Sequence, residues 1–165
     1  MRIPRILAAS VAFSGAIVLG IGPALADSPH FIKSSASITS SGDLTVSFKE
    51  AGLGNNQLIH YVASADATAD YGCVNGGGNH PQATNKETVS GPVTAEDTFS
   101  SGRNGTISQS LTLHPPGPGN FTCPGGQTLV LADVTYTNAS LTDTTNGVAA
   151  NIPGTFSKVF VTFRK

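Results

Sequence analysis

The sequence has little of what charged or aromatic protein surfaces are made from. Tryptophan is absent, and charged residues make up 12% of the 165 residues, against roughly 25% in an ordinary soluble domain. A coiled coil or a charge-rich helical bundle is therefore excluded, because exposed helix faces are normally built from Glu, Lys and Arg. Sugar-binding platforms usually rely on exposed aromatic rings, so the lack of tryptophan also disfavours a stacking platform.

Positive charge is scarce and scattered. Nine Lys and Arg residues stand against ten Asp and Glu residues, and the basic residues form no cluster. Nucleic-acid binding requires a basic patch that neutralises phosphates, and recruitment to an anionic membrane requires a polybasic segment. We therefore expect no nucleic-acid partner and no electrostatic attachment to a membrane.

The first 26 residues have the composition of a secretory signal peptide. Arg2 and Arg5 precede an apolar stretch over residues 6–21, and Ala24-Leu25-Ala26 follows as a cleavage site. A transmembrane anchor is the alternative, which the polar residues and glycines inside the stretch disfavour. We expect residues 1–26 to be removed and the rest to be secreted, extracellular and without a membrane anchor.

The remaining residues, 27–165, have a suitable length for a single domain with one core. Without the two arginines of the signal, seven basic residues stand against ten acidic ones. Solubility must then come mainly from hydroxyl and amide groups, and Ser, Thr and Asn are abundant. This composition is typical of an extracellular β protein, with Thr on strands and Ser, Gly and Asn in turns.

The two cysteines, Cys73 and Cys123, both lie in this domain. An even number of cysteines in an exported chain predicts a disulfide, and two cysteines allow only one pairing. Closing a loop of about 50 residues should stabilise the fold by roughly 4 kcal/mol. Free buried thiols are the alternative, whereas a C-x-x-C redox motif or a zinc cluster is excluded by the number and spacing of the cysteines.

Apolar and polar residues alternate with period two along most of the domain, as in half-buried antiparallel strands. The clearest run extends from Ile59 to Cys73, where every odd position is apolar. Its length predicts a strand that is bent or interrupted near Ser64 to Asp66. The expected strands are residues 31–39, 44–50, 57–64, 66–74, 86–90, 93–99, 105–113, 128–138, 139–144 and 155–164.

Parity within these runs predicts which side chains face the core. Four consecutive inward positions of the long run are alanines, which implies bulky side chains opposite them or a close approach of two layers. The other expected inward residues near the C-terminus are Val130, Ala132, Val134, Tyr136, Val159, Val161 and Phe163.

Turn signals separate the strands at the spacing of a β-sandwich. Ser41-Gly42-Asp43 divides the first two strands, Asn104-Gly105 and Asn146-Gly147 resemble hairpin turns, and Pro92 is expected to split residues 86–99 into two edge-type segments. We therefore predict an all-β fold, an immunoglobulin-like or Greek-key antiparallel β-sandwich with one disulfide. A closed barrel is the second choice.

Two long Gly- and Pro-rich segments, residues 75–85 and 114–126, are expected to be loops. The disulfide would bring them to the same pole of the sandwich, and loops on a rigid scaffold commonly carry binding function. His80 and His114 could together bind a transition metal or act as acid and base, with ordinary loop polarity as the alternative. The candidate binding residues are Asn75, Asn79, His80, His114, Asn120 and Phe121.

Catalytic and metal-binding motifs are missing from the sequence. It contains no G-x-S-x-G elbow, no H-E-x-x-H helix, no phosphate-binding loop and no EF-hand. Asp66 and Asp70 share one side of a strand but are separated by about 13 Å, too far for a glycosidase pair. Residues 143–147 lack the alternating ligands of a calcium loop and read as a turn. We expect no enzymatic activity, no cofactor and no metal.

Two resemblances bear on function. Residues 71–79, 85–86, 115–118 and 123–129 resemble small exported bacterial β-sandwich proteins of uncharacterised function, a likeness that implies no activity. Residues 46–53 and 104–106 are similar, more loosely, to the neocarzinostatin-like apoproteins, secreted sandwiches that carry an apolar chromophore and have two disulfides. This chain has cysteines for one.

The leading hypothesis is a secreted, non-enzymatic module that binds an extracellular protein, a glycan or a small molecule through the loops near the disulfide. The alternative is a small-molecule carrier with a cleft between the sheets, which the inward alanines suggest. A hydrolase is the third hypothesis and would require His80, His114 and a carboxylate to lie together.

Overall fold

The computed structural model describes residues 28–76 and 85–163, so the predicted signal peptide lies outside the described residues. In these residues it contains eight strands and one short 3-10 helix, η1 (Gly102–Asn104), and no helix that could cross a membrane. The strands are β1 (His30–Ile38), β2 (Leu44–Ala51), β3 (Leu58–Asn75), β4 (Lys86–Ser100), β5 (Ile107–Leu113), β6 (Gln127–Asp143), β7 (Val148–Ile152) and β8 (Phe156–Val159).

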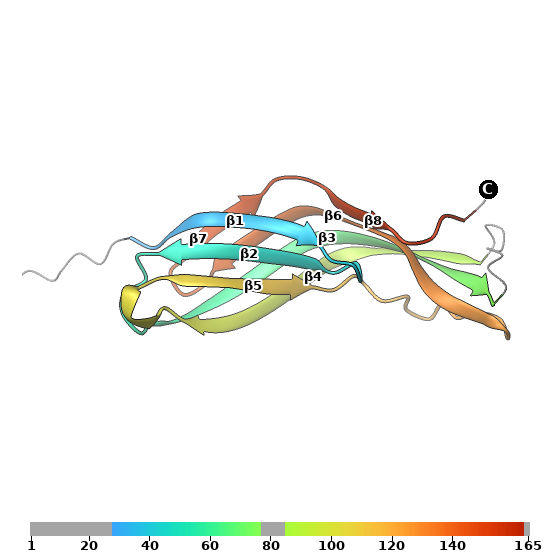
Figure 1. Ribbon diagram of the computed structural model, residues 1–165, viewed down its shortest axis with the longest axis horizontal. Coiled ribbons are helices and arrows are strands. Elements are labelled where there is room, and N and C mark those ends of the chain that lie inside the picture. Colours follow the sequence, from blue (N-terminus) through green and yellow to red (C-terminus); the bar gives the residue numbers. More distant parts are fainter. Residues whose placement is uncertain (1–27, 77–84, 164–165) are drawn as a thin grey trace, which may run out of the picture.

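The strands form two antiparallel sheets. One has the order β1-β2-β5, and the other has the order β4-β3-β6-β7, with β8 also paired to β6. The two sheets lie face to face over part of the molecule, and β3, β4 and β6 continue well beyond the smaller sheet (Figure 1). The all-β, sandwich-like architecture with one disulfide is therefore confirmed.

The core lies between the sheets and follows the alternation in the sequence. Tyr61 and Tyr136 are fully buried, and the rings of Phe31, Phe48 and Phe99 pack around Tyr61 with centroids 4.5 to 6.3 Å apart. The four inward alanines of β3 are at most 4% exposed. Burial of such a continuous apolar layer is the main force that holds the two sheets together.

The long run was predicted to be bent or interrupted near Ser64 to Asp66, and the interruption is wrong, because β3 pairs with β4 in unbroken register. The register with β6 does shift between Ser64 and Asp66, but β6 supplies the extra residue. Asn138, which lies there, has a positive φ of 53°, a conformation that asparagine tolerates better than most residues. β6 thus bends as one strand across the predicted boundary at residue 138.

A second register shift changes which side chains of β6 face the core. Between Asp70 and Tyr71 of β3, the partner strand again contains one extra residue, Ala132. A bulge of this kind reverses the parity on its far side, so Leu131 packs against the core while Val130 lies opposite Gly72. The prediction that Val130 faces inward is therefore wrong.

Pro92 does not split β4, as the sequence suggested it would. β4 is the edge strand of the larger sheet, so one side of its backbone pairs with none of the described strands. Proline lacks an N–H and is tolerated at such an edge, where Pro92 lies opposite Asp66. At the other edge, β7 had not been predicted, and β8 is shorter than expected, with Val159 exposed to 66% rather than inward.

The two Asn-Gly turns have different roles. Asn146-Gly147 joins β6 to its neighbour β7 as a hairpin, as predicted. Asn104-Gly105 leads instead from β4 in one sheet to β5 in the other, so the prediction of a hairpin there is wrong. The buried Ser101 holds this crossing, because its hydroxyl donates to the Gly54 carbonyl at 2.6 Å.

Candidate functional site

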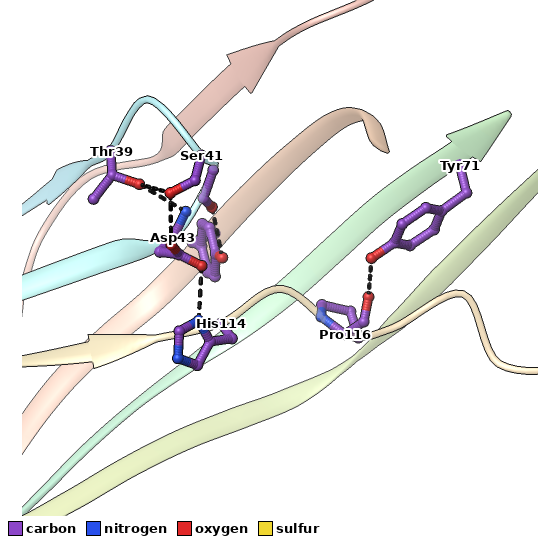
Figure 2. Close-up of polar contacts among 8 residues, drawn as sticks. Thr39, Ser41, Asp43, Tyr71, His114 and Pro116 are labelled. Atoms are coloured by element: carbon purple, nitrogen blue, oxygen red, sulfur yellow. Dashed lines mark hydrogen bonds and ion pairs between the residues drawn. The ribbon is translucent and has the colours of Figure 1, made fainter. Parts of the chain in front are cut away.

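The loop between β5 and β6, residues 114–126, lies along the part of the larger sheet that the smaller sheet leaves uncovered (Figure 1). The predicted disulfide is confirmed, joining Cys73 of β3 to Cys123 of the loop with their Cα atoms 5.6 Å apart. The hydroxyl of Tyr71 donates to the Pro116 carbonyl at 2.8 Å (Figure 2). Phe121 packs its ring against the core. The loop is thus anchored at three separate points.

The opposite side of this loop is open to solvent. Asn120 and Thr122 are exposed on either side of the anchoring Phe121, and Asn75 is exposed at the end of β3, two residues after Cys73. The Asn85 carbonyl accepts from the Cys73 N–H at 3.3 Å, which ties the end of the other predicted loop to the same place. Asn79 and His80 lie outside the described residues.

His114 begins the loop and contacts the turn between β1 and β2. Its Nδ1 lies 2.8 Å from Oδ1 of Asp43, and the Ser41 hydroxyl donates to Oδ2 of the same carboxylate at 2.7 Å (Figure 2). The Asp43 N–H in turn donates to Thr39 Oγ1 at 3.0 Å. From the core, the hydroxyl of Tyr136 donates to the Gly42 carbonyl at 2.8 Å. The turn is therefore held from both sides.

Electrostatics at this cluster favour the ionised carboxylate. The hydrogen bond from Ser41 and then that with His114 lower the pKa of Asp43 below its ordinary value, and partial burial acts in the opposite direction. The His114 side chain remains 77% exposed. The charge of Asp43 is thus stabilised by its neighbours, whereas the imidazole is accessible to a partner.

In hydrolases with a catalytic triad, a carboxylate orients an imidazole through one ring nitrogen. The other ring nitrogen accepts the proton of a nucleophile such as serine. Here the hydroxyl of Ser41 donates to the same carboxylate that His114 contacts. The carboxylate therefore accepts from both groups, and no proton relay from Ser41 to His114 is formed. In the described part of the chain, no three His, Cys, Asp or Glu side chains are arranged to hold a metal.

A second polar cluster is buried inside the sandwich. Glu50 and Asp143 are both fully buried, and the Tyr61 hydroxyl donates to Glu50 Oε2 at 2.7 Å. Asp143 accepts from the backbone N–H groups of Thr145 and Asn146 at 2.8 and 2.9 Å. The other oxygen of Glu50 receives no hydrogen bond from the described residues. Burial raises the pKa of Glu50 to about 7, and the nearby Asp143 adds to this against the opposing hydrogen bond from Tyr61.

Neither Asp43 nor Glu50 had been singled out in the sequence. For Glu50 a signal was present, because Leu44, Val46 and Phe48 make every even position of that strand inward and Glu50 continues the series. For Asp43 the sequence carries no such pattern, because its partner His114 is 71 residues away in the chain and the two meet only in the folded structure.

Open grooves lie over the outer face of the β1-β2-β5 sheet, beside the C-terminal segment and next to β7. The four inward alanines line none of these three grooves. Comparison with protein-family models, with curated proteins and with solved structures finds no match to this chain. Its function must therefore be inferred from its own residues.

Proposed function

We propose that this protein is a secreted, non-enzymatic module that binds an extracellular partner through the exposed side of the loop over residues 114–126 and the adjoining end of β3. The observation that carries this proposal is the three-point anchoring of an irregular segment by Tyr71, Phe121 and the disulfide. A segment already fixed in one conformation loses little entropy when it binds, so it is well suited to recognition.

The exposed groups indicate the chemistry of the partner. Asn75 and Asn120 offer amides, and Thr122 offers a hydroxyl. These groups both donate and accept hydrogen bonds and carry no charge. We therefore expect a neutral partner that presents hydroxyl or amide groups, with a neutral glycan as the first choice.

The proposal is tested by binding of the purified protein to an array of neutral oligosaccharides. The double substitution Asn75→Ala with Asn120→Ala should abolish the signal. The matched control replaces two asparagines that are equally exposed but lie elsewhere, Asn104→Ala with Asn151→Ala, and should leave it intact. Failure of the unmodified protein to bind any member of the array, or equal losses in both double variants, would contradict the proposal.

We further propose that the sandwich is of the immunoglobulin-like, Greek-key type. The support is its strand order, in which the chain passes from one sheet to the other after β2, after β4 and after β5. An experimental structure in which β2 and β5 were not neighbours would refute this assignment.

A further inference from the structure

Two lysines lie directly opposite each other on the outer face of the smaller sheet. Lys33 of β1 and Lys49 of β2 are register partners, and both are exposed. Like charges at opposed positions of a strand pair repel each other and destabilise the pair. The one acidic residue of β1, β2 and β5 is Glu50, which is buried. This face is therefore positive in a chain whose formal net charge is −1.

The lysines line an open groove of about 530 Å³. Two rows of side chains cross the three strands there, the first formed by Lys33, Lys49 and Ser108 and the second by Ser35, Ser47 and Ser110. Ile32, at the bulge in β1 next to Lys33, is 54% exposed and also lines the groove. Two ammonium groups, several hydroxyls and the apolar side chain of Ile32 thus line a common space.

We propose that this groove binds an acidic carbohydrate, a sugar chain that carries carboxylate groups. The opposed ammonium groups supply the charge that a carboxylate needs, and a bound carboxylate would relieve their mutual repulsion. The serine hydroxyls both donate and accept, which matches the hydroxyls of a sugar ring. Ile32 offers a surface for the ring's C–H face. The groove shares no residue with the loop site, so the two proposals stand independently.

The probe for the test is a polygalacturonate oligomer, titrated into the purified protein by calorimetry. The fully methyl-esterified oligomer serves as its neutral counterpart, and sulfate and phosphate serve as simple anions. We expect the acid to bind and the ester to bind at least about tenfold more weakly, because the ester lacks the charge. Affinity for the acid should fall as NaCl is raised, since salt screens exposed charges.

The decisive variant is Lys33→Gln with Lys49→Gln, which should lose about tenfold or more in affinity for the acid. The control, Lys86→Gln with Lys158→Gln, removes the same charge from lysines that lie over the Phe163 and Phe160 rings, and should change affinity by less than about twofold. Circular dichroism would verify that both variants fold. The proposal is overturned if the acid does not bind, if the ester or a simple anion binds as well, or if both variants lose equally.

Discussion

The carboxyl group of Glu50 should make the stability of this protein fall between mildly acidic and neutral pH. It is completely buried, one of its oxygens receives no hydrogen bond within the described part of the chain, and the carboxyl group of Asp143 is close enough to disfavour its ionisation. The other oxygen accepts from Tyr61, which compensates only in part. Ionising such a group in the folded state is unfavourable, so the folded protein retains the proton to higher pH than the unfolded chain does.

The size of the effect follows from the two pKa values of Glu50. Its ordinary value of 4.5 applies to the unfolded chain, and burial raises the folded value to about 7. The folded state therefore binds more protons between these values, and stability falls as pH rises from 4.5 to about 7. At about 1.4 kcal/mol for each pH unit the shift sets a ceiling of about 3.5 kcal/mol, which relaxation of the surroundings reduces to roughly 2 kcal/mol.

The substitution Glu50→Gln removes the titration while keeping the shape of the side chain. The free energy of unfolding in urea, followed by circular dichroism from pH 4 to 8, should then lose this fall, and above pH 7 the variant should be more stable than the unmodified protein. Glu87→Gln, at an exposed position of β4, is the matched control and should keep the original pH profile. The reasoning is refuted if Glu50→Gln shows the unmodified pH slope or is the less stable protein at pH 8.

Two further predictions concern the extended part of the larger sheet. A Cβ atom added at Gly72 would overlap the ring of Phe163, so Gly72→Ala should lower the free energy of unfolding by about 1–3 kcal/mol. A Cβ atom added at Gly91 would have no described atom within 4 Å, so Gly91→Ala should have little effect. Equal losses of stability in the two variants, measured by thermal unfolding, would contradict the packing of Phe163 against Gly72. Replacing Cys73 and Cys123 by serine should destabilise the fold by roughly 4 kcal/mol, measured against the unmodified protein in urea, and an unchanged midpoint would show that the loop closure contributes nothing.

Local alternation was sufficient to predict most strands, but not their partners. The inward series that begins with Leu44 and the series from Ile59 to Cys73 both have the burial that their parity predicted. At the Asn-Gly turn of residues 104–105, the local pattern predicted a hairpin that does not form. The turn's glycine has a positive φ of 62°, so a turn does form there, yet the next strand pairs in the other sheet, because pairing depends on contacts distant in the chain.

The same distinction applies to the candidate site. The count of cysteines was enough to predict the disulfide, whereas the contact between Asp43 and His114 requires the register of β2 and β5. Leu44 pairs with Leu113 at the end of that register, Asp43 is the residue just before β2, and His114 is the residue just after β5. Once the register is known, the contact follows from the geometry of an antiparallel pair.

The lysine groove depends on a single extra residue in β1. Phe31 lies opposite Glu50, and both are inward, but Lys33 rather than Ile32 lies opposite Lys49. Without the bulge, regular pairing would place Lys33 opposite the buried Phe48, on the face toward the core. Burying an unpaired ammonium group there would be strongly unfavourable, so the bulge keeps this charge at the surface. Regular pairing would already place Ile32 opposite Lys49 on the outer face, so what the bulge adds is Lys33, which brings a second ammonium group to this face beside Lys49 and Ile32.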